Sequence, residues 1–312
     1  MSETKIGLGL AALGRPEYIN IRTDNDIDKS EEAFKQNTFN VLDLAYQKGI
    51  RYFDTAPSYG KGEAFLQEWN TTKKHTDVIL GTKWGYTYVA NWKLGYEGKH
   101  EIKEHSLNKL KEQWQVSKNL LPKLKIYQVH SATFESGILK NLEVLNKLHD
   151  IKTQFGLLIG ITTSGANQKN IIAEALKIEI NNQPLFDSFQ VTYNILEQST
   201  ISILKILKQL NKTIIIKEAL ANGRVINDNK YSNQLKSISM KYNVGIDALA
   251  LRFIVDSLEP DYVLSGASNI KQLEQNLKAL DFKLTQEEIN SLSLLKSNSE
   301  YYWSERNELE WN

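Results

Sequence analysis

Four side chains of the types that transfer protons follow short apolar runs of the chain. Asp54 and Tyr59 lie in "RYFDTAPSYG", and Pro57 stands in the turn between them. Lys83 lies in "ILGTKWG" and His130 in "IYQVHSA". A buried Lys or Asp is rarely tolerated without a partner of opposite charge. If these runs are neighbouring strands, Asp54 and Lys83 are therefore expected to form an ion pair.

The chemistry that these four groups support together is the reduction of a carbonyl. A phenol is a weak acid with a pKa of about 10, and the ammonium of Lys83 beside Tyr59 would lower that pKa. The phenol would then be a usable proton donor, and His130 would donate a hydrogen bond that orients the carbonyl. A lone His or Lys at a strand end is usually structural, whereas four compatible groups on three consecutive strand ends indicate catalysis.

The composition excludes several other classes of function. The 312 residues contain no cysteine, which rules out disulfides, thiolate metal sites and cysteine nucleophiles, and no metal site is expected. With 38 basic and 37 acidic side chains the net charge is +1, so neither nucleic acid nor an anionic membrane is expected as a partner. No apolar run reaches membrane-spanning length and the first residues lack a signal-peptide pattern, so a cytoplasmic location is expected.

The candidate residues lie at the ends of apolar runs that alternate with amphipathic helical patterns. Near-continuous apolar runs are typical of parallel strands that are covered on both faces. Eight such runs are predicted to be strands, at residues 5–13, 50–56, 77–85, 124–132, 155–164, 187–194, 212–220 and 261–268. Helices are predicted between them, among others at 37–49, 135–150, 269–280 and 285–296, the last opening with an N-cap Thr.

Eight strand–helix units predict an α/β fold, a (β/α)8 TIM barrel formed by residues 1–312 as a single domain. A doubly wound sheet is less favoured because "GLGLAALG" lacks the spacing of a dinucleotide-binding turn. Two long connections, from Arg15 to about Glu32 and from 86 to 99, leave the strand ends where barrel active sites lie. Aromatic residues in the second connection and elsewhere predict a substrate pocket that includes Trp84, Tyr86, Trp92 and Trp303.

The motifs quoted above, together with "FQVTYN" and "LSGASNIKQLEQN", resemble those of the aldo-keto reductase family. The resemblance covers nearly the whole chain, and the motifs come in the order that the family has. It implies that NADPH, or alternatively NADH, binds across the barrel mouth and passes hydride to an aldehyde or ketone. It also implies a catalytic tetrad, with Tyr59 as general acid or base, formed by Asp54, Tyr59, Lys83 and His130.

The resemblance further implies which residues bind the cofactor. Gln190 matches the glutamine that holds the carboxamide, and Thr162 and Thr163 stand in place of the usual Ser-Asn pair. After the seventh strand the aromatic residue that often stacks on nicotinamide is missing, and the implied contacts are Lys217, Leu220, Gly223 and Arg224. The segment that binds adenosine in the family corresponds to Gly266, Ser268, Gln272, Gln275 and Asn276. Ser268 and the neighbouring Lys271 favour NADPH, although many members have a basic residue at the position of Gln272.

Two other functions stay open from the sequence. A Schiff-base aldolase would use Lys83 or Lys217 in a desolvated barrel mouth, and a regulatory subunit would bind a cofactor without turnover. The substrate is expected to be a small carbonyl compound, and neither its identity nor the oligomeric state is specified. The aromatic C-terminus, residues 299–312, either packs on the outer helices or covers the substrate. His100 and His105 are expected to be solvated.

Overall fold

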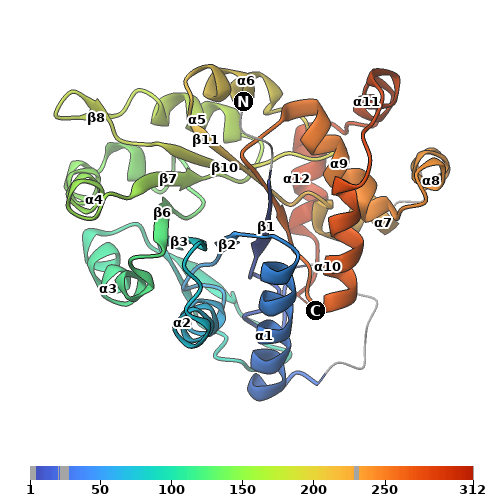
Figure 1. The fold of residues 1–312 in the computed structure, drawn as a ribbon. Helices are drawn as coiled ribbons and strands as arrows, with labels where there is room; N and C mark the ends of the chain where they lie inside the picture. The colour runs from blue at the N-terminus through green and yellow to red at the C-terminus, as the bar shows by residue number, and fades with distance from the viewer. Residues whose placement is uncertain (1–4, 20, 22–27, 228–231, 312) are drawn as a thin grey trace.

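Eight parallel strands close into a barrel in the computed structural model, which describes residues 5–19, 21, 28–227 and 232–311. Each strand is hydrogen-bonded to its neighbours in the barrel, and the last one pairs with the first (Figure 1). Around the barrel the strands are β1 (Lys5–Gly9), β2 (Tyr52–Asp54), β3 (Ile79–Trp84), β6 (Leu124–Val129), β7 (Leu158–Thr162), β10 (Ser188–Thr192), β11 (Thr213–Lys217) and β12 (Tyr262–Ser265). Each lies inside one of the eight predicted runs, so the predicted (β/α)8 fold is confirmed.

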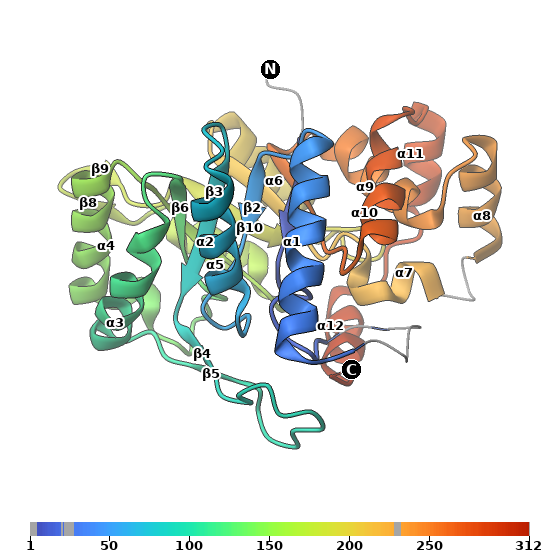
Figure 2. The same ribbon diagram turned by 60° about the horizontal axis from the view of Figure 1, so that its bottom comes forward.

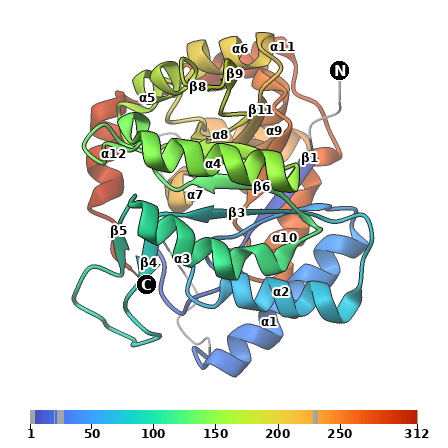
Figure 3. The same ribbon diagram turned by 90° about the vertical axis from the view of Figure 1, so that its left-hand side faces the viewer.

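Helices cover the outside of the barrel (Figures 1 and 3). Those that follow the first six barrel strands are α1 (Glu31–Gln47), α2 (Gly62–Lys73), α3 (Leu107–Ser117), α4 (Leu142–Phe155), α5 (Gln168–Ala175) and α6 (Ile201–Gln209). The remainder are α7 (Arg224–Asn227), α8 (Ser232–Lys241), α9 (Ile246–Leu258), α10 (Ile270–Leu277), α11 (Gln286–Ser293) and α12 (Ser299–Asn307). The described residues also form 3-10 turns at η1 (Lys118–Leu120), η2 (Ile138–Lys140), η3 (Ala221–Gly223) and η4 (Lys278–Leu280).

Side-chain caps determine where several helices begin. The predicted cap of α11 is confirmed, since the Thr285 and Glu288 side chains bond reciprocally to each other's backbone N–H groups. Helix α1 starts at residue 31 rather than at the predicted 37, because the Ser30 side chain accepts from a backbone N–H of its first turn. Helix α4 starts later than predicted because Asn141 caps it in the same way.

The predicted long connection after β3 contains a β-hairpin. Strand β4 (Tyr86–Tyr88) pairs antiparallel with β5 (Glu101–Lys103), and the hairpin extends beyond the barrel on the side of α12 and the C-terminus (Figure 2). Gly85, with φ of 105°, turns the chain out of β3, and a Cβ there would collide with the His105 ring. The connection from Arg15 to about Glu32 lies partly outside the described residues. A second hairpin joins β8 (Glu179–Ile180) to β9 (Gln183–Pro184).

Tyr52 fills the interior of the barrel below the strand ends that carry the candidate residues. Its ring stacks on Tyr262 with centroids 4.3 Å apart, and a Cβ on Gly81 would collide with its hydroxyl. The hydroxyl donates a hydrogen bond of 3.0 Å to Asp54. Within the described ranges, none of the helices combines the length and apolar character that crossing a membrane requires. The same ranges hold no group of His, Cys, Asp and Glu arranged for metal binding.

Candidate active site

Asp54 and Lys83 form an ion pair at the ends of β2 and β3, as predicted. Their side chains are 2% and 0% exposed, so water contributes almost nothing to their solvation. The second carboxylate oxygen of Asp54 accepts further hydrogen bonds of 3.0–3.2 Å from Tyr52, Gln128 and Gln190. Because every charge of the pair has hydrogen-bond partners, the burial of both groups is compatible with a stable fold.

Tyr59 lies next to this pair, with its ring close to two cations. Lys83 Nζ is 4.7 Å from the ring centroid, and the guanidinium carbon of Arg15 is 5.2 Å from it. Burial, and secondly the charge of Asp54, raise the pKa of Tyr59 well above its usual 10, although Arg15 opposes them. The expected lowering of this pKa is therefore wrong. The reason is that Asp54 offsets the ammonium of Lys83, while the phenol is removed from water.

His130 presents a neutral imidazole to the same site. Burial, followed by the charges of Lys83 and Lys217, lowers its pKa well below 6.5, so the ring is uncharged near neutral pH. Nδ1 lies 3.4 Å from Ser58 Oγ, and the ring meets Tyr59 edge-on with centroids 5.6 Å apart. A neutral imidazole can donate one hydrogen bond, which suits a carbonyl oxygen placed between it and the phenol.

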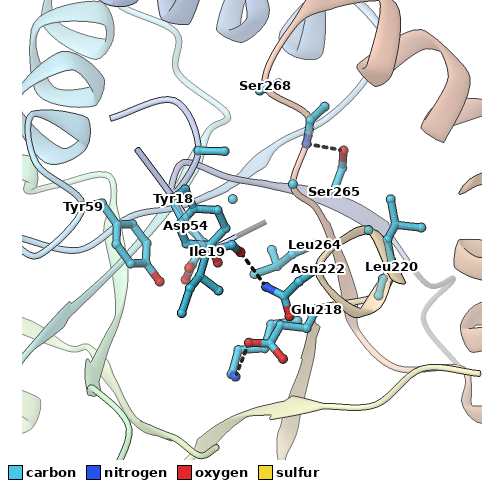
Figure 4. A pocket seen from close by; sticks show the side chains of 18 of the residues that line it. Tyr18, Ile19, Asp54, Tyr59, Glu218, Leu220, Asn222, Leu264, Ser265 and Ser268 are labelled. Atoms are coloured by element: carbon cyan, nitrogen blue, oxygen red, sulfur yellow. Dashed lines mark hydrogen bonds and ion pairs between the residues drawn. The ribbon is translucent and has the colours of Figure 1, made fainter. Parts of the chain in front are cut away.

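A cavity of about 440 Å³ runs from these residues across the mouth of the barrel. Figure 4 shows Asp54 and Tyr59 near Tyr18 and Ile19, with Leu220 and Ser268 farther along. The candidate residues that line it are Asp54, Tyr59, Tyr86, His130, Gln190, Lys217, Leu220, Gly223, Gly266, Ser268, Gln272 and Asn276. The cavity therefore joins three of the four catalytic candidates to most of the cofactor candidates, which lie on β10, β11 and the segments after β11 and β12.

Residues 5–296 match the model of the aldo/keto reductase family. The chain belongs to the aldo-keto reductase family. Among its relatives, aldo-keto reductase str7 of Strobilurus tenacellus is 23% identical, over 96% of this chain and 90% of its own. An oxidoreductase of Bacillus subtilis, YqkF, is 25% identical over 86% of this chain and 93% of its own. Aldo-keto reductase AKR11C1 from Bacillus halodurans, solved in its holo form, has the same fold, with a TM-score of 0.71, 20% identity and coverage of 95% and 93%.

As an aldo-keto reductase, the protein is an NAD(P)H-dependent oxidoreductase that acts on carbonyl or alcohol groups of small molecules. The Schiff-base and regulatory alternatives are not favoured by this membership. Lys83 is also unsuited to forming an imine, because its side chain is fully buried and donates hydrogen bonds to Asp54 and to the Thr55 carbonyl.

Three tryptophans that were predicted to line the substrate pocket do not line this cavity. Trp84 is completely buried in the core, because its neighbour Lys83 faces the barrel interior and strand residues alternate between faces. Trp303 is also in the core, at 5% exposure. Trp92 lines a different hollow, where its Nε1 donates to the Lys29 carbonyl at 2.8 Å. These three predictions are corrected, and Tyr86 alone of the four aromatic residues lines the cavity.

Three predicted cofactor residues also lie outside the cavity lining. Thr162 Oγ1 accepts a hydrogen bond from the Ser131 N–H at 2.7 Å, which supports the loop after His130. Arg224 lies over the Tyr302 ring at 4.0 Å and donates to the Tyr302 carbonyl, so it fastens α12 to the barrel. Gln275 is half-buried on α10. None of the three is among the residues that line this cavity.

Several lining residues were not predicted from the sequence. Arg15 is 2% exposed, bonds to Glu101 at 2.6 Å, and contacts the rings of Tyr18 and Trp311 at 4.8 Å. Trp311 also forms an isolated bridge with Ile19, so the segment after β1 and the C-terminal tail meet over the cavity. Glu101, Lys103, Ser131 and Ser164 line it as well. The only local signal was a charge or polar group in a loop after a strand, which is too common to single out these positions.

The two histidines that were expected to be solvated are buried instead. His100 stacks on Trp311 with centroids 4.2 Å apart, and His105 Nε2 is 2.9 Å from the His130 carbonyl. Burial lowers the pKa of His105 to about 4. Both rings therefore contact residues that line the cavity, His100 through the Trp311 ring and His105 through the His130 carbonyl.

A cluster of three charges lies midway along the cavity. Lys217 Nζ donates to Ser164 and Thr192 at 3.1 and 2.8 Å and is 3.8 Å from Glu218. Glu218 in turn accepts from Arg306 of α12 at 2.9 Å. Burial, more than any other cause, lowers the pKa of Lys217 to about 8. Two cations share one carboxylate here, which leaves an excess positive charge for an anionic ligand.

The part of the cavity from Lys217 to the start of α10, here called the far arm, has polar groups suited to a dinucleotide. A Cβ on Gly266 would meet nothing within 4 Å, so the wall there is open to a ligand. Asn269 caps the N-terminus of α10, and helix N-termini attract phosphate groups. Asn222 lines the arm, and its buried Oδ1 has no hydrogen-bond partner within the described part of the chain. A cation, hydroxyls, an unsatisfied acceptor and a helix N-terminus together form a donor and acceptor set that NAD(P)H would satisfy.

Proposed function

We propose that this aldo-keto reductase reduces an aldehyde or ketone with Tyr59 as proton donor and His130 as the group that orients the carbonyl. The observation that carries the proposal is that Tyr59 and His130 face one cavity, next to the buried pair of Asp54 and Lys83. The same residues would catalyse alcohol oxidation in the reverse direction, and residues 1–312 would act as one domain.

Each of the four side chains has a distinct task in this proposal. Tyr59 holds its proton until negative charge develops on the substrate oxygen, because burial keeps its pKa high. The neutral His130 donates a hydrogen bond to that oxygen. Lys83 stabilises the phenolate that remains, and Asp54 fixes the position of Lys83. Bound NAD(P)H would supply the hydride.

The cofactor would be held along the far arm of the cavity. Lys217 would compensate phosphate charge, and the open wall at Gly266 would admit the dinucleotide. We favour NADPH over NADH because Ser268, Lys271 and the N-terminus of α10 would attract a 2′-phosphate.

Aromatic walls on the substrate side support a carbonyl compound that carries a ring. Tyr18, Tyr86 and Trp311 line this side of the cavity, and Tyr86 lies 4.9 Å from His130 between ring centroids. Rings in these positions would contact the substrate and exclude water from the reacting carbon.

The decisive experiment is turnover of a panel of aldehydes and ketones by wild type and Tyr59→Phe, with cofactor affinity measured by fluorescence quenching. Tyr59→Phe should lower kcat by roughly 10²–10⁴-fold, the usual contribution of a positioned acid, and leave cofactor affinity near that of wild type. Tyr301→Phe, on the exposed face of α12, is the control and should match wild type.

Tyr18 supplies a second phenol in the same cavity and therefore a direct rival. If Tyr18→Phe abolishes turnover while Tyr59→Phe keeps more than about a tenth of it, Tyr59 is not the proton donor.

A further inference from the structure

Lys103 places a second ammonium group on the substrate side of the cavity. It lies on β5 directly opposite Tyr86 of β4, and its Nζ is 5.4 Å from the Tyr86 ring centroid. Nζ donates a hydrogen bond of 2.9 Å to the carbonyl of Ser131, the residue that follows His130. Lys103, Tyr86, Ser131 and His130 all line the cavity. The ammonium is therefore held at the residue that follows His130, and both Lys103 and His130 contact the Tyr86 ring.

The hairpin that carries Lys103 is fastened to the barrel at several points. Gln113 of α3 accepts from the Gly85 N–H and donates to the Tyr86 carbonyl, both at 2.8 Å. The Glu104 N–H donates to the Gly85 carbonyl at 2.9 Å, and His105 meets the His130 carbonyl. The position of Lys103 is thus set before any ligand arrives, which reduces the conformational entropy lost on binding.

The other cations near the reacting groups are neutralised by carboxylates, and Lys103 is not. Lys83 pairs with Asp54, and Arg15 pairs with Glu101 at 2.6 Å. Within the described part of the chain, Lys103 has no carboxylate at ion-pair distance, and Glu135, whose charge acts on it, is fully exposed. Burial lowers the pKa of Lys103, which is the expected effect on an ammonium that lacks a counterion.

The negative charge closest in sequence, Glu101, does not supply that counterion. Glu101 and Lys103 are two residues apart on β5 and face the same side of the hairpin. The carboxylate of Glu101 is bound by Arg15 instead. Among the described residues on and directly behind the substrate side of the cavity, the cations are Arg15, Lys83 and Lys103 and the carboxylates are Asp54 and Glu101, so Lys103 accounts for the excess positive charge.

From this arrangement we propose that Lys103 forms an anion-binding subsite and that the substrates are aldehydes or ketones that carry a carboxylate. The inference rests on the proposed function, since it requires the carbonyl to lie at Tyr59 and His130. A substrate whose carbonyl lies at Tyr59 and His130 extends along the Tyr86 ring. A carboxylate at the end of the substrate away from that carbonyl then reaches Lys103. A single ammonium matches the single charge of a carboxylate. The Lys103 ammonium is already oriented by its charge-assisted hydrogen bond to the Ser131 carbonyl.

The test compares the three positional isomers of carboxybenzaldehyde with their neutral methyl esters, using wild type, Lys103→Met, Lys103→Arg and Lys99→Met. For wild type, kcat/KM for at least one acid should exceed that for its ester by roughly tenfold to a hundredfold, the worth of a hydrogen bond to a charged group. Lys103→Met should abolish this preference through KM for the acid, and Lys103→Arg should restore part of it. Lys99→Met, on the exposed part of the same loop, should keep the wild-type preference.

Two results would overturn the inference while leaving the proposed function intact. One is an equal kcat/KM of wild type for the acids and for their esters. The other is a decrease of kcat/KM in Lys103→Met that is the same for acids and esters, which would indicate a structural role of Lys103. The absence of turnover of any compound by wild type, with either cofactor, would instead overturn the proposed function and the inference with it.

Discussion

At the scale of single residues, the pair of Asp54 and Lys83 combines a proposed catalytic role with nearly complete burial. A buried pair contributes little net stability, but removing one partner leaves an uncompensated charge in a medium of low polarity. Asp54 keeps three other hydrogen-bond donors when Lys83 is absent, yet none of them carries a charge.

We therefore expect Lys83→Met to lower the free energy of unfolding by about 3–5 kcal/mol and to reduce turnover. The double variant Asp54→Asn, Lys83→Met should recover part of the stability while remaining inactive, because no buried charge is left. Urea denaturation with a single transition measures both effects. Equal stability of the single and double variants would contradict the idea that an unpaired Asp54 is the cause.

Lys217 is the residue through which pH should act on cofactor binding. Its pKa of about 8 means that the free protein loses this ammonium as the pH rises through that value. A phosphate group binds the charged form, so cofactor affinity should fall above about pH 8, by up to roughly tenfold per pH unit. Titrations of fluorescence quenching across this range would measure it.

The controls for this pH dependence are two substitutions of the same residue. Lys217→Met should bind the cofactor weakly at every pH, whereas Lys217→Arg stays charged and should bind without a decline above pH 8. A wild-type pH profile in Lys217→Met would exclude Lys217 as the titrating group.

At the scale of elements, three segments that are far apart in the chain cover the cavity. These are the segment after β1, the β4–β5 hairpin and the C-terminal tail, which meet through Arg15, Glu101 and Trp311. The sequence left open whether the aromatic tail packs against the protein or covers the substrate, and each interpretation holds for different residues of the tail. Tyr302 and Trp303 are packed in the core, at 0% and 5% exposure, whereas Trp311 lines the cavity.

Two truncations should therefore behave differently. Deletion of residues 308–312 removes Trp311 and should raise KM for the carbonyl compound roughly fivefold to tenfold, with little change in cofactor affinity or Tm. Deletion of 299–312 also removes two buried aromatic side chains and should destabilise the protein by several kcal/mol. Steady-state kinetics and thermal denaturation of both proteins, beside Trp311→Phe, would measure this. Unchanged substrate kinetics after the shorter deletion would remove the tail from the substrate site.

At the scale of the whole molecule, the net charge of +1 provides no strong field that would attract an anionic cofactor. Cofactor selection should therefore depend on local charges at the end of the cavity. In the proposed binding mode, Lys271 and the N-terminus of α10 would attract a 2′-phosphate there, while Asp247, which also lines the cavity, would limit the preference.

We expect kcat/KM to be higher with NADPH than with NADH at low salt, and the ratio to decrease as salt is added. Lys271→Met should lower the efficiency with NADPH by roughly fivefold, the equivalent of about 1 kcal/mol for an exposed charge pair, and leave that with NADH unchanged. Lys278→Met, on the turn that follows α10, is a suitable control. Higher efficiency of wild type with NADH would refute the choice of NADPH.

The amino-acid sequence alone was sufficient for the barrel and for the positions of its catalytic candidates. Apolar runs of strand length are local features, and the parallel order brings all carboxyl ends to one face. Asp54, Lys83 and His130 each follow such a run directly, so their convergence could be predicted without knowledge of any long-range contact. The ion pair of Asp54 and Lys83 followed from the cost of burying either charge alone.

Only the tertiary structure decided which residues line the cavity and in which direction the pKa values of Tyr59 and His130 move. Trp84 points away from the site because it follows an inward-facing residue on the same strand, which an apolar run does not reveal. Arg15, Lys103 and Trp311 reach the cavity through contacts between segments that are distant in the chain. The pKa of Tyr59 rises because burial and Asp54 outweigh the nearby cations, and that balance depends on distances that only the folded chain defines.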